Sequence, residues 1–155
     1  MLETYKPDID ELGFRQSLMA DPETMSYNDA WGGTIPFPEE DWKDWFEYWF
    51  DAPESMMYYR YLYDPDLKAF VGEIAYHYDE ERKIHICDVI VLARYRNRGY
   101  GSAGLQLLCK AAKENGISVL YDDIGADNPS WKLFLKNGFS IDYRTDDVVM
   151  VKKML

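Results

Sequence analysis

The most regular pattern along the chain is a series of apolar runs that short polar turns separate. The runs cover residues 56–63, 70–78 and 84–92 and are rich in β-branched and aromatic residues. This pattern predicts three consecutive antiparallel strands. The acidic stretch DEERK, residues 79–83, is then the hairpin loop between the last two strands.

Beyond these strands, helical and strand-like patterns alternate. Amphipathic segments at 101–115 and 128–136 predict helices. Further strands are expected at 118–123 and, as a closing pair, at 139–143 and 148–153. Antiparallel strands followed by a β-α-β-α-β order predict an α/β (α+β) fold. Its mixed, largely antiparallel central sheet would hold about seven strands with flanking helices.

The first 53 residues follow a different pattern. Residues 2–5 are expected to form a short strand, and Asp8 can cap a helix that runs to about Met19. Residues 21–37 are rich in Pro, Gly and Asn and predict an ordered loop. A second helix is expected from Pro38 through the segment DWKDWFEYWF. It carries aromatic residues on more than one side, so it is buried on both flanks or lines a pocket.

The charge is distributed unevenly over the chain. The 155 residues, expected to form one domain, carry a net charge of −11, which argues against nucleic acid as the main partner. Residues 1–83 hold 20 acidic and 7 basic side chains, whereas residues 84–155 hold 8 and 10. This asymmetry is typical of a protein that binds a cation with one half and an anion with the other. Ordinary solubilising surface charge would explain the acid excess but not its uneven distribution.

Several features indicate a cytoplasmic protein. No window holds the roughly 18 uninterrupted apolar residues that a membrane span needs. The N-terminal residues lack the basic and apolar segments of a signal peptide. Cys87 and Cys109 lie in apolar stretches without metal-like spacing, so they are expected to be buried, reduced thiols, with a disulfide as the less favoured alternative. No metal site is predicted.

The junction RYRNRGYGSAG, residues 94–104, connects a predicted strand to a predicted helix. Glycines at such a junction expose consecutive backbone N–H groups at the positive end of the helix dipole. Arginines within it add charge-assisted hydrogen bonds to an anion. The spacing R-x-x-G-x-G differs from that of the P-loop and of the Rossmann turn. It predicts a pyrophosphate cradle, the alternative being a turn that only caps the helix.

Arg96, Gly99 and Gly101 resemble the acyl-CoA motif [RQ]-x-x-G-x-[GA] of the GNAT acyltransferase superfamily. The preceding strand VIVLARYR is similar to the usual approach to that motif, with Ala93 in place of a proline. Downstream, Asn128 and the segment WKLFLKNGF resemble the second signature of the family. The resemblance covers residues 54–155 well and residues 1–53 poorly.

The resemblance implies a sheet that is splayed between its fourth and fifth strands, with acetyl-CoA bound in the gap. Residues 54–155 would form the sheet and cofactor-binding core, and residues 1–53 the acceptor side. Val89 and Val91 would bind the pantetheine arm through backbone hydrogen bonds, and the amide of Val91 would face the thioester oxygen. The remaining cofactor contacts implied are Arg96, Asn97, Arg98, Gly99, Tyr100, Gly101, Ser102, Asn128, Trp131 and Phe134.

Direct transfer of an acetyl group to a primary amine requires a base. His85 is the first candidate, because it shares a strand face with Val89 and Val91 by alternation. A histidine satisfied within the sheet explains it equally well. Glu73 on the neighbouring strand is the second candidate, although a surface carboxylate is the simpler interpretation. Asp88 ranks third, since it points to the opposite face unless the bulge of the family at this strand re-aims it.

One departure from the family concerns the proton donor for the leaving thiolate. Many members carry a tyrosine where this chain has Phe134, and a phenyl ring cannot donate a proton. Tyr100, Tyr121 or water could substitute. The departure keeps open an alternative function, namely a non-catalytic acyl-CoA-binding or protein-interaction module on the same fold.

The acceptor is expected under the first two helices and their loop. Carboxylates and aromatic faces there favour a small cationic amine, and a protein or peptide amine is the alternative. Each tryptophan could instead be a core residue. Homodimerisation stays open. The acceptor-binding residues that the sequence predicts are Tyr27, Asp29, Trp31 and Trp45.

Overall fold

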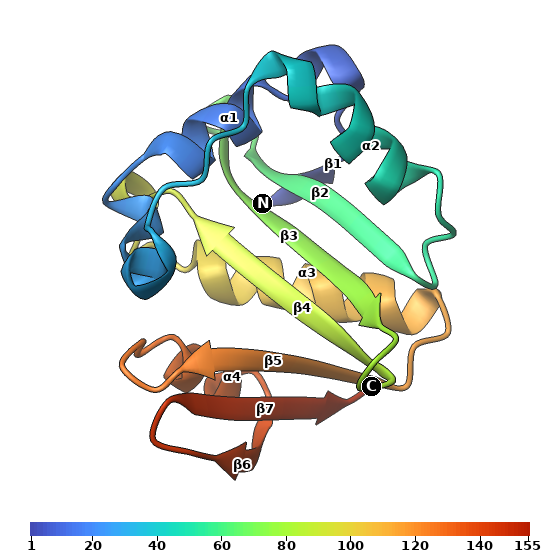
Figure 1. Cartoon of the computed structure of the whole chain (residues 1–155), viewed down its shortest axis with the longest axis vertical. Helices are drawn as coiled ribbons and strands as arrows, with labels where there is room; N and C mark the ends of the chain where they lie inside the picture. The colour runs from blue at the N-terminus through green and yellow to red at the C-terminus, as the bar shows by residue number, and fades with distance from the viewer.

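The computed structural model describes all 155 residues except the side chains of Ala30 and Trp31. Its centre is a seven-stranded sheet with the order β1-β2-β3-β4-β5-β7-β6 (Figure 1). Only β4 and β5 pair in parallel. The strands are β1 (Glu3–Tyr5), β2 (Met57–Asp64), β3 (Ala69–Asp79), β4 (Ile84–Val91), β5 (Val119–Gly125), β6 (Ser140–Arg144) and β7 (Val148–Met154). The predicted mixed, largely antiparallel sheet is therefore confirmed.

Four α-helices and four short 3₁₀ helices surround the sheet. The α-helices are α1 (Gly13–Ala20), α2 (Trp42–Phe50), α3 (Tyr100–Glu114) and α4 (Trp131–Lys136). The 3₁₀ helices are η1 (Ile9–Glu11), η2 (Thr24–Trp31), η3 (Glu39–Asp41) and η4 (Ala93–Tyr95). None of these helices combines the length and apolarity that a membrane crossing requires, as far as the described residues go.

The N-terminal part differs from the sequence prediction in two places. The helix expected from Asp8 is divided at the fully buried Leu12 into η1 and α1, and Asp8 caps only η1, its N–H donating to Glu11 Oε1 at 2.9 Å. The expected loop over residues 21–37 contains the helical turns of η2. Thr24 and Met25 at its start are fully buried, so packing shapes a segment whose composition favours a loop.

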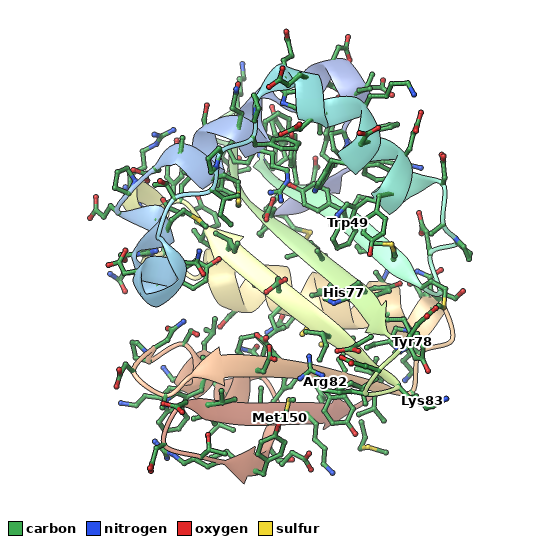
Figure 2. All side chains as sticks on the ribbon, in the orientation of Figure 1. Trp49, His77, Tyr78, Arg82, Lys83 and Met150 are labelled. Atoms are coloured by element: carbon green, nitrogen blue, oxygen red, sulfur yellow. The ribbon has the colours of Figure 1, made fainter. Side chains whose placement is uncertain are left out.

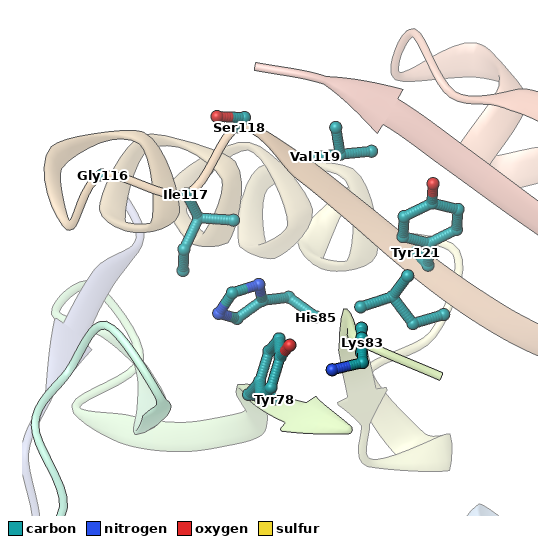
Figure 3. A pocket seen from close by; sticks show the side chains of 9 residues that line it. Tyr78, Lys83, His85, Gly116, Ile117, Ser118, Val119 and Tyr121 are labelled. Carbon is teal, nitrogen blue, oxygen red and sulfur yellow. The ribbon is translucent and has the colours of Figure 1, made fainter. Parts of the chain in front are cut away.

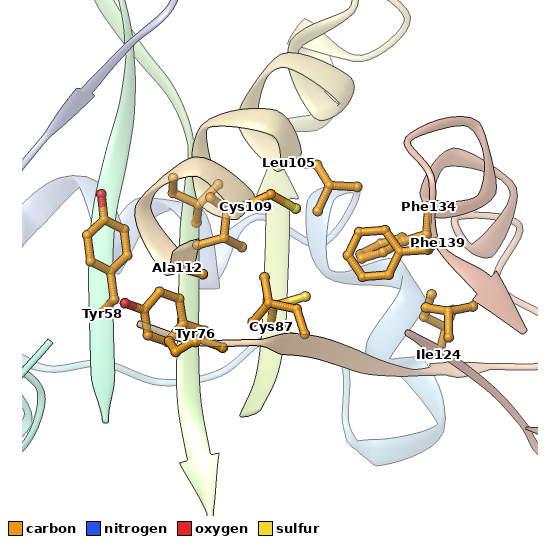
Figure 4. Close-up of a cluster of buried hydrophobic side chains, with 14 of the residues drawn as sticks. Tyr58, Tyr76, Cys87, Leu105, Cys109, Ala112, Ile124, Phe134 and Phe139 are labelled. Carbon is orange, nitrogen blue, oxygen red and sulfur yellow. The ribbon is translucent and has the colours of Figure 1, made fainter. Parts of the chain in front are cut away.

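The two faces of the sheet bury different sets of side chains. α3 and α4 cover the rear face in Figure 1, where apolar residues of β2 to β5 and β7 form the main core (Figure 4). Cys87 and Cys109 are free thiols, both buried in this core. α1 and α2 cover the other face over β2 and β3 with an aromatic cluster. In that cluster, Trp49 lies 6.3 Å from His77 between ring centroids (Figure 2).

The predicted splay between the fourth and fifth strands is present. β4 and β5 pair only at His85–Leu120 and Ile86–Tyr121. β4 nevertheless continues along β3 up to Val91, and β5 continues along β7 up to Gly125. The two strands therefore diverge beyond Ile86 and form a wedge that opens toward the carboxyl end of β4 (Figure 1).

Candidate active site

The β4 wall of the wedge presents unpaired backbone groups. Leu92 N donates to Val71 O at 2.9 Å, so this opposite pair is a hydrogen-bonded one. Because hydrogen-bonded pairs alternate along an antiparallel ladder, Ile90 also bonds to β3, whereas Val89 and Val91 turn their N–H and C=O groups away from β3. These groups point toward β5, which has already diverged. The wedge can therefore hydrogen-bond an extended ligand as a neighbouring strand would.

Gly72 on β3 maintains the orientation of the Ile90–Val91 peptide. A Cβ atom at Gly72 would lie 2.2 Å from Ile90 O and 3.0 Å from Val91 Cα, distances that no side chain tolerates. The missing side chain lets the Ile90 carbonyl point at β3. Since C=O and N–H of one trans peptide point in opposite directions, the Val91 N–H is then directed into the wedge.

We expect Gly72→Ala to lower turnover about 10- to 100-fold while affinity for the pyrophosphate end of the cofactor changes little, because the added Cβ must turn the Ile90–Val91 peptide. Steady-state kinetics measure turnover, calorimetry with coenzyme A measures the affinity, and the amide chemical shift of Val91 reports the orientation of the peptide. Gly104→Ala is the matched control, since its Cβ meets side chains and no backbone, namely Leu62 Cδ1 at 2.8 Å and Ile74 Cγ2 at 3.4 Å. Equal loss of turnover in both variants would contradict a role for the peptide orientation.

The arginine-rich junction forms a turn that exposes the start of α3. Asn97 and Gly99 adopt positive φ angles of 63° and 86°, and α3 begins at Tyr100. The intrahelical bond from Ala103 N to Gly99 O, at 3.1 Å, leaves the N–H groups of residues 100–102 without a helical partner. Three free N–H groups at the positive end of a 15-residue helix suit a phosphate group.

The side chains of this turn differ in whether they are already hydrogen-bonded within the protein. Arg98 is exposed and is free to approach an anion, whereas Arg96 Nη2 donates to Thr24 O at 2.9 Å. Tyr100 donates its hydroxyl hydrogen to Asp64, and Ser102 Oγ accepts from Asn137 at 3.1 Å. Tyr100 and Ser102 therefore offer their backbone N–H groups, and Arg98 supplies the freest charge.

The turn is also connected to the acceptor side. Thr24, which is fully buried in η2, accepts a hydrogen bond from Ala93 N to its Oγ1 at 2.9 Å, in addition to the bond from Arg96. Two of its atoms thus join η2 to the residues that lead into the motif.

The remaining predicted cofactor residues lie at and after the end of β5. Asn128 Oδ1 accepts from Ser130 N at 3.0 Å and shapes the entry into α4. Trp131 packs against the main core on one side and lies 5.3 Å from the Arg144 guanidinium. Phe134 is only 3% exposed and packs against Phe139, so it belongs to the core.

Two carboxylates lie together on the face that α1 and α2 cover. Glu73 is opposite Ile90, and Asp88 is two residues from Ile90 on β4, so the two acids are diagonal neighbours on one face. Glu73 is 5% exposed, and its Oε2 accepts from the Tyr59 hydroxyl and lies 3.5 Å from Arg15 Nη1. Glu73 is therefore already engaged by two side chains.

Asp88 is better placed to accept a proton. Its side chain is open to solvent, and among the described residues no hydrogen bond or ion pair to it is found. The protein packed around it raises the pKa of its carboxyl to about 6, with further increases from the charges of Glu73 and Asp123 and an opposing effect of Arg15. A base with a pKa near neutrality is efficient at physiological pH.

This arrangement favours Asp88 over His85 as a candidate for the base. Alternation does place Asp88 opposite to the face of Val89 and Val91, as the sequence predicts. That opposite face, however, is the one that α1 and α2 cover, where the sequence predicts the acceptor.

His85 lies at the other end of the sheet. It pairs with Leu120 where β4 and β5 are still joined, and its Nε2 is 2.8 Å from Ser55 O. It lines a hollow of about 340 Å³ with Tyr78, Lys83 and Tyr121 (Figure 3). It lies six positions before Val91, about 20 Å along an extended strand. This position does not suit His85 for the role of general base that the sequence predicts.

The acceptor residues that the sequence predicts are only partly brought together. Tyr27 lies near the carboxylates, since the charges of Asp88 and Glu73 add to burial in raising the pKa of its hydroxyl. Asp29 is exposed. Trp45 packs edge-on against Tyr59 at 4.8 Å within the aromatic cluster. The side chain of Trp31 lies outside the described part of the structure.

Arg15 lies beside Glu73 at the candidate site, and the sequence pattern does not identify it. Its side chain is 15% exposed, and its guanidinium lies 5.0 Å from the Phe37 ring and 4.7 Å from the Trp45 ring. In the described structure its Nε and Nη1 are buried without a hydrogen-bond partner. The available signal was one basic residue in the apolar helix GFRQSLMA.

We expect the free energy of unfolding to fall as pH rises from about 4 to about 6 through the contribution of Asp88. Its folded pKa of about 6 lies above its ordinary 3.8, so the folded protein binds more protons in this window. Asp88→Asn removes the effect and gains stability relative to the original protein at neutral pH, by about 1 kcal/mol or less because solvent screens an exposed carboxylate.

Urea unfolding of both proteins at pH about 4 and about 7 measures this difference. The half-buried His77 has a lowered pKa and gives a slope of opposite sign, but it is common to both proteins and cancels in the comparison. A stability difference that does not change with pH would contradict the shifted carboxyl of Asp88.

The fold is of an acyltransferase class. Its mixed seven-stranded sheet has an open wedge between β4 and β5, next to the exposed N-terminus of α3. The model of the Acetyltransferase (GNAT) family matches residues 18–139, and the chain belongs to this family. A relative is an uncharacterized N-acetyltransferase of Schizosaccharomyces pombe, 31% identical over 80 residues. The match covers 50% of this chain and 56% of that relative, so the chain spans little more than half of its length.

Solved structures share the fold across the whole chain. YncA from Salmonella typhimurium, solved with its cofactor acetyl-CoA, has a TM-score of 0.75 at 14% identity and covers 100% of this chain and 94% of its own. A spermidine N-acetyltransferase chimera of Vibrio cholerae SpeG and hSSAT has a TM-score of 0.77 at 12% identity, with coverages of 99% and 95%. At such identities these likenesses show the fold alone.

Proposed function

We propose that the chain is an acetyl-CoA-dependent N-acetyltransferase that acts on a primary amine by direct transfer in a ternary complex. The observation that carries this proposal is the open β4–β5 wedge, with the Val89 and Val91 backbone groups facing it, next to the exposed N-terminus of α3. These parts fit an extended arm that ends in a pyrophosphate. Bound acetyl-CoA supplies the activated acetyl thioester.

Residues at the start of α3 bind the cofactor, and residues of β4 take part in the transfer. The N–H groups of residues 100–102 and the Arg98 guanidinium hold the pyrophosphate. The Val91 N–H donates to the carbonyl oxygen that gains negative charge. Asp88 takes the proton that the attacking amine must lose.

A small cationic amine is the acceptor that the charges favour. Glu73 and Asp88 share the acceptor face, and the segment before β4 carries most of the acidic residues of the chain. Arg15 partly balances Glu73, whereas Asp88 is left to attract an ammonium group. A protein or peptide amine would need to reach the same two carboxylates.

Calorimetry with acetyl-CoA, followed by thiol release over a panel of amines, tests the proposal. We expect binding and turnover with at least one aliphatic amine or polyamine. No binding at millimolar acetyl-CoA would overturn the cofactor assignment. Tight binding without turnover on any amine would favour the non-catalytic module, for which the buried Phe134 at the usual tyrosine position is the supporting observation.

A further inference from the structure

The segment η2 lies over the acceptor face at the open end of the wedge. Met25 of η2 is fully buried and packs in one cluster with Leu92 and Ile90 at the end of β4. Ile90 shares its sheet face with Glu73 and Asp88. Figure 1 shows η2, in blue, beside the arrowhead of β4. The position of η2 therefore limits the space that an amine has above these two carboxylates.

Two hydrogen bonds hold η2 to the residues that follow β4. Thr24, the first residue of η2, is fully buried. Its Oγ1 accepts from Ala93 N and its backbone O accepts from Arg96 Nη2, both at 2.9 Å. The Thr24 hydroxyl also donates to Asp21. Loss of the Ala93 N–H would leave a buried oxygen without this donor, so the position of η2 depends on it.

Ala93 departs from the residue type that is usual at its position. The approach to the acyl-CoA motif in the family has a proline where this chain has Ala93. Proline has no N–H and cannot donate to Thr24. The backbone itself suits proline, since Ala93 is the first residue of η4 and Leu92 before it has a ψ of 134°. What Ala93 contributes is therefore its N–H rather than the shape of the turn.

We propose that Ala93 and Arg96 are positioning residues for the acceptor amine, which act by holding η2 through Thr24. This inference rests on the proposed function. It assigns two arginines of the turn to different sites, namely Arg98 to the pyrophosphate and Arg96 to the acceptor segment. The free N–H groups at the start of α3 take no part in this attachment, so affinity for the cofactor is independent of it.

The first test compares Ala93→Pro with the matched control Ala93→Ser. Proline removes the N–H and places a ring carbon where its hydrogen lies, so η2 must move away, whereas serine keeps the N–H. We expect Ala93→Pro to raise the KM of the amine at least about tenfold, with kcat and the affinity for coenzyme A changed less than about threefold. Equal kinetics of the two variants, or an equally large loss of coenzyme A affinity, would overturn the inference.

The two arginines provide a second comparison, because Arg98 is exposed and Arg96 is bonded to Thr24. We expect Arg96→Ala to raise the KM of the amine about fivefold and to change coenzyme A affinity less than about threefold. Arg98→Ala should do the reverse and weaken coenzyme A binding about tenfold. If Arg96→Ala weakened coenzyme A binding and left the KM of the amine unchanged, Arg96 would belong to the cofactor site.

Hydrogen exchange of the backbone amides of η2 tests the attachment without turnover. We expect these amides to exchange at least about tenfold faster in Ala93→Pro than in Ala93→Ser, because a released segment opens more often. Equal exchange would overturn the inference, whereas absence of turnover in the unmodified protein would overturn the proposed function. If Ala93→Pro fails to fold, Thr24→Val takes its place with Thr24→Ser as control, since valine lacks the accepting hydroxyl and serine keeps it.

Discussion

Gly101→Glu weakens the binding of acetyl-CoA at least about 100-fold, whereas the protein still folds. Gly101 is the second residue of α3 and offers one of its three free N–H groups. A glutamate places a negative charge where the pyrophosphate is held, and it also blocks the close approach of the backbone. Calorimetry measures the loss, and circular dichroism with thermal unfolding verifies the fold.

Gly101→Ala is the matched control. A Cβ at this position lies 3.0 Å from Leu133 Cδ2, so both variants require the same small movement of that side chain. The alanine variant should retain binding within about tenfold, because it adds no charge. If both variants bound acetyl-CoA as the original protein does, the start of α3 would not be the phosphate site.

Asp88→Asn is expected to lower turnover by about 100- to 1,000-fold and to remove the rise of kcat/KM with pH near the carboxyl pKa of about 6. The ionised form of Asp88 accepts the proton, so activity increases as pH rises through that value. The amide of asparagine has a similar size but accepts no proton. Initial rates over a pH series, with a saturating and a limiting amine concentration, measure both effects.

His85→Ala serves as the comparison for this prediction. We expect His85→Ala to retain the rise of kcat/KM with pH, because the imidazole lies at the closed end of the wedge and contacts Ser55 O. If this rise vanished in His85→Ala and persisted in Asp88→Asn, the base would be His85 after all.

Local chemistry explains which parts of the fold and site could be predicted. Strand and helix periodicity depends on neighbouring residues, so the seven strands appear where the apolar runs indicate. The spacing of Arg96, Gly99 and Gly101 is likewise local, and it identifies the exposed start of α3 without any knowledge of distant residues.

The candidate site depends on contacts that no local pattern records. Alternation placed Asp88 correctly relative to Val91, but only the position of α1 and α2 over the sheet shows that its face is the acceptor face. Arg15 and Glu73 are 58 positions apart and meet through tertiary packing.

The attachment of η2 to the motif turn has a consequence for protein engineering. Thr24 accepts hydrogen bonds from Ala93 and Arg96, so two hydrogen bonds join the acceptor-side segment to the turn before α3, although about 70 residues separate them. Exchanging residues 1–53 for the corresponding part of a relative, in order to change the acceptor, would therefore also disturb the turn. A functional chimera should retain Thr24 and its two donors, so that a new specificity does not come with a damaged cofactor site.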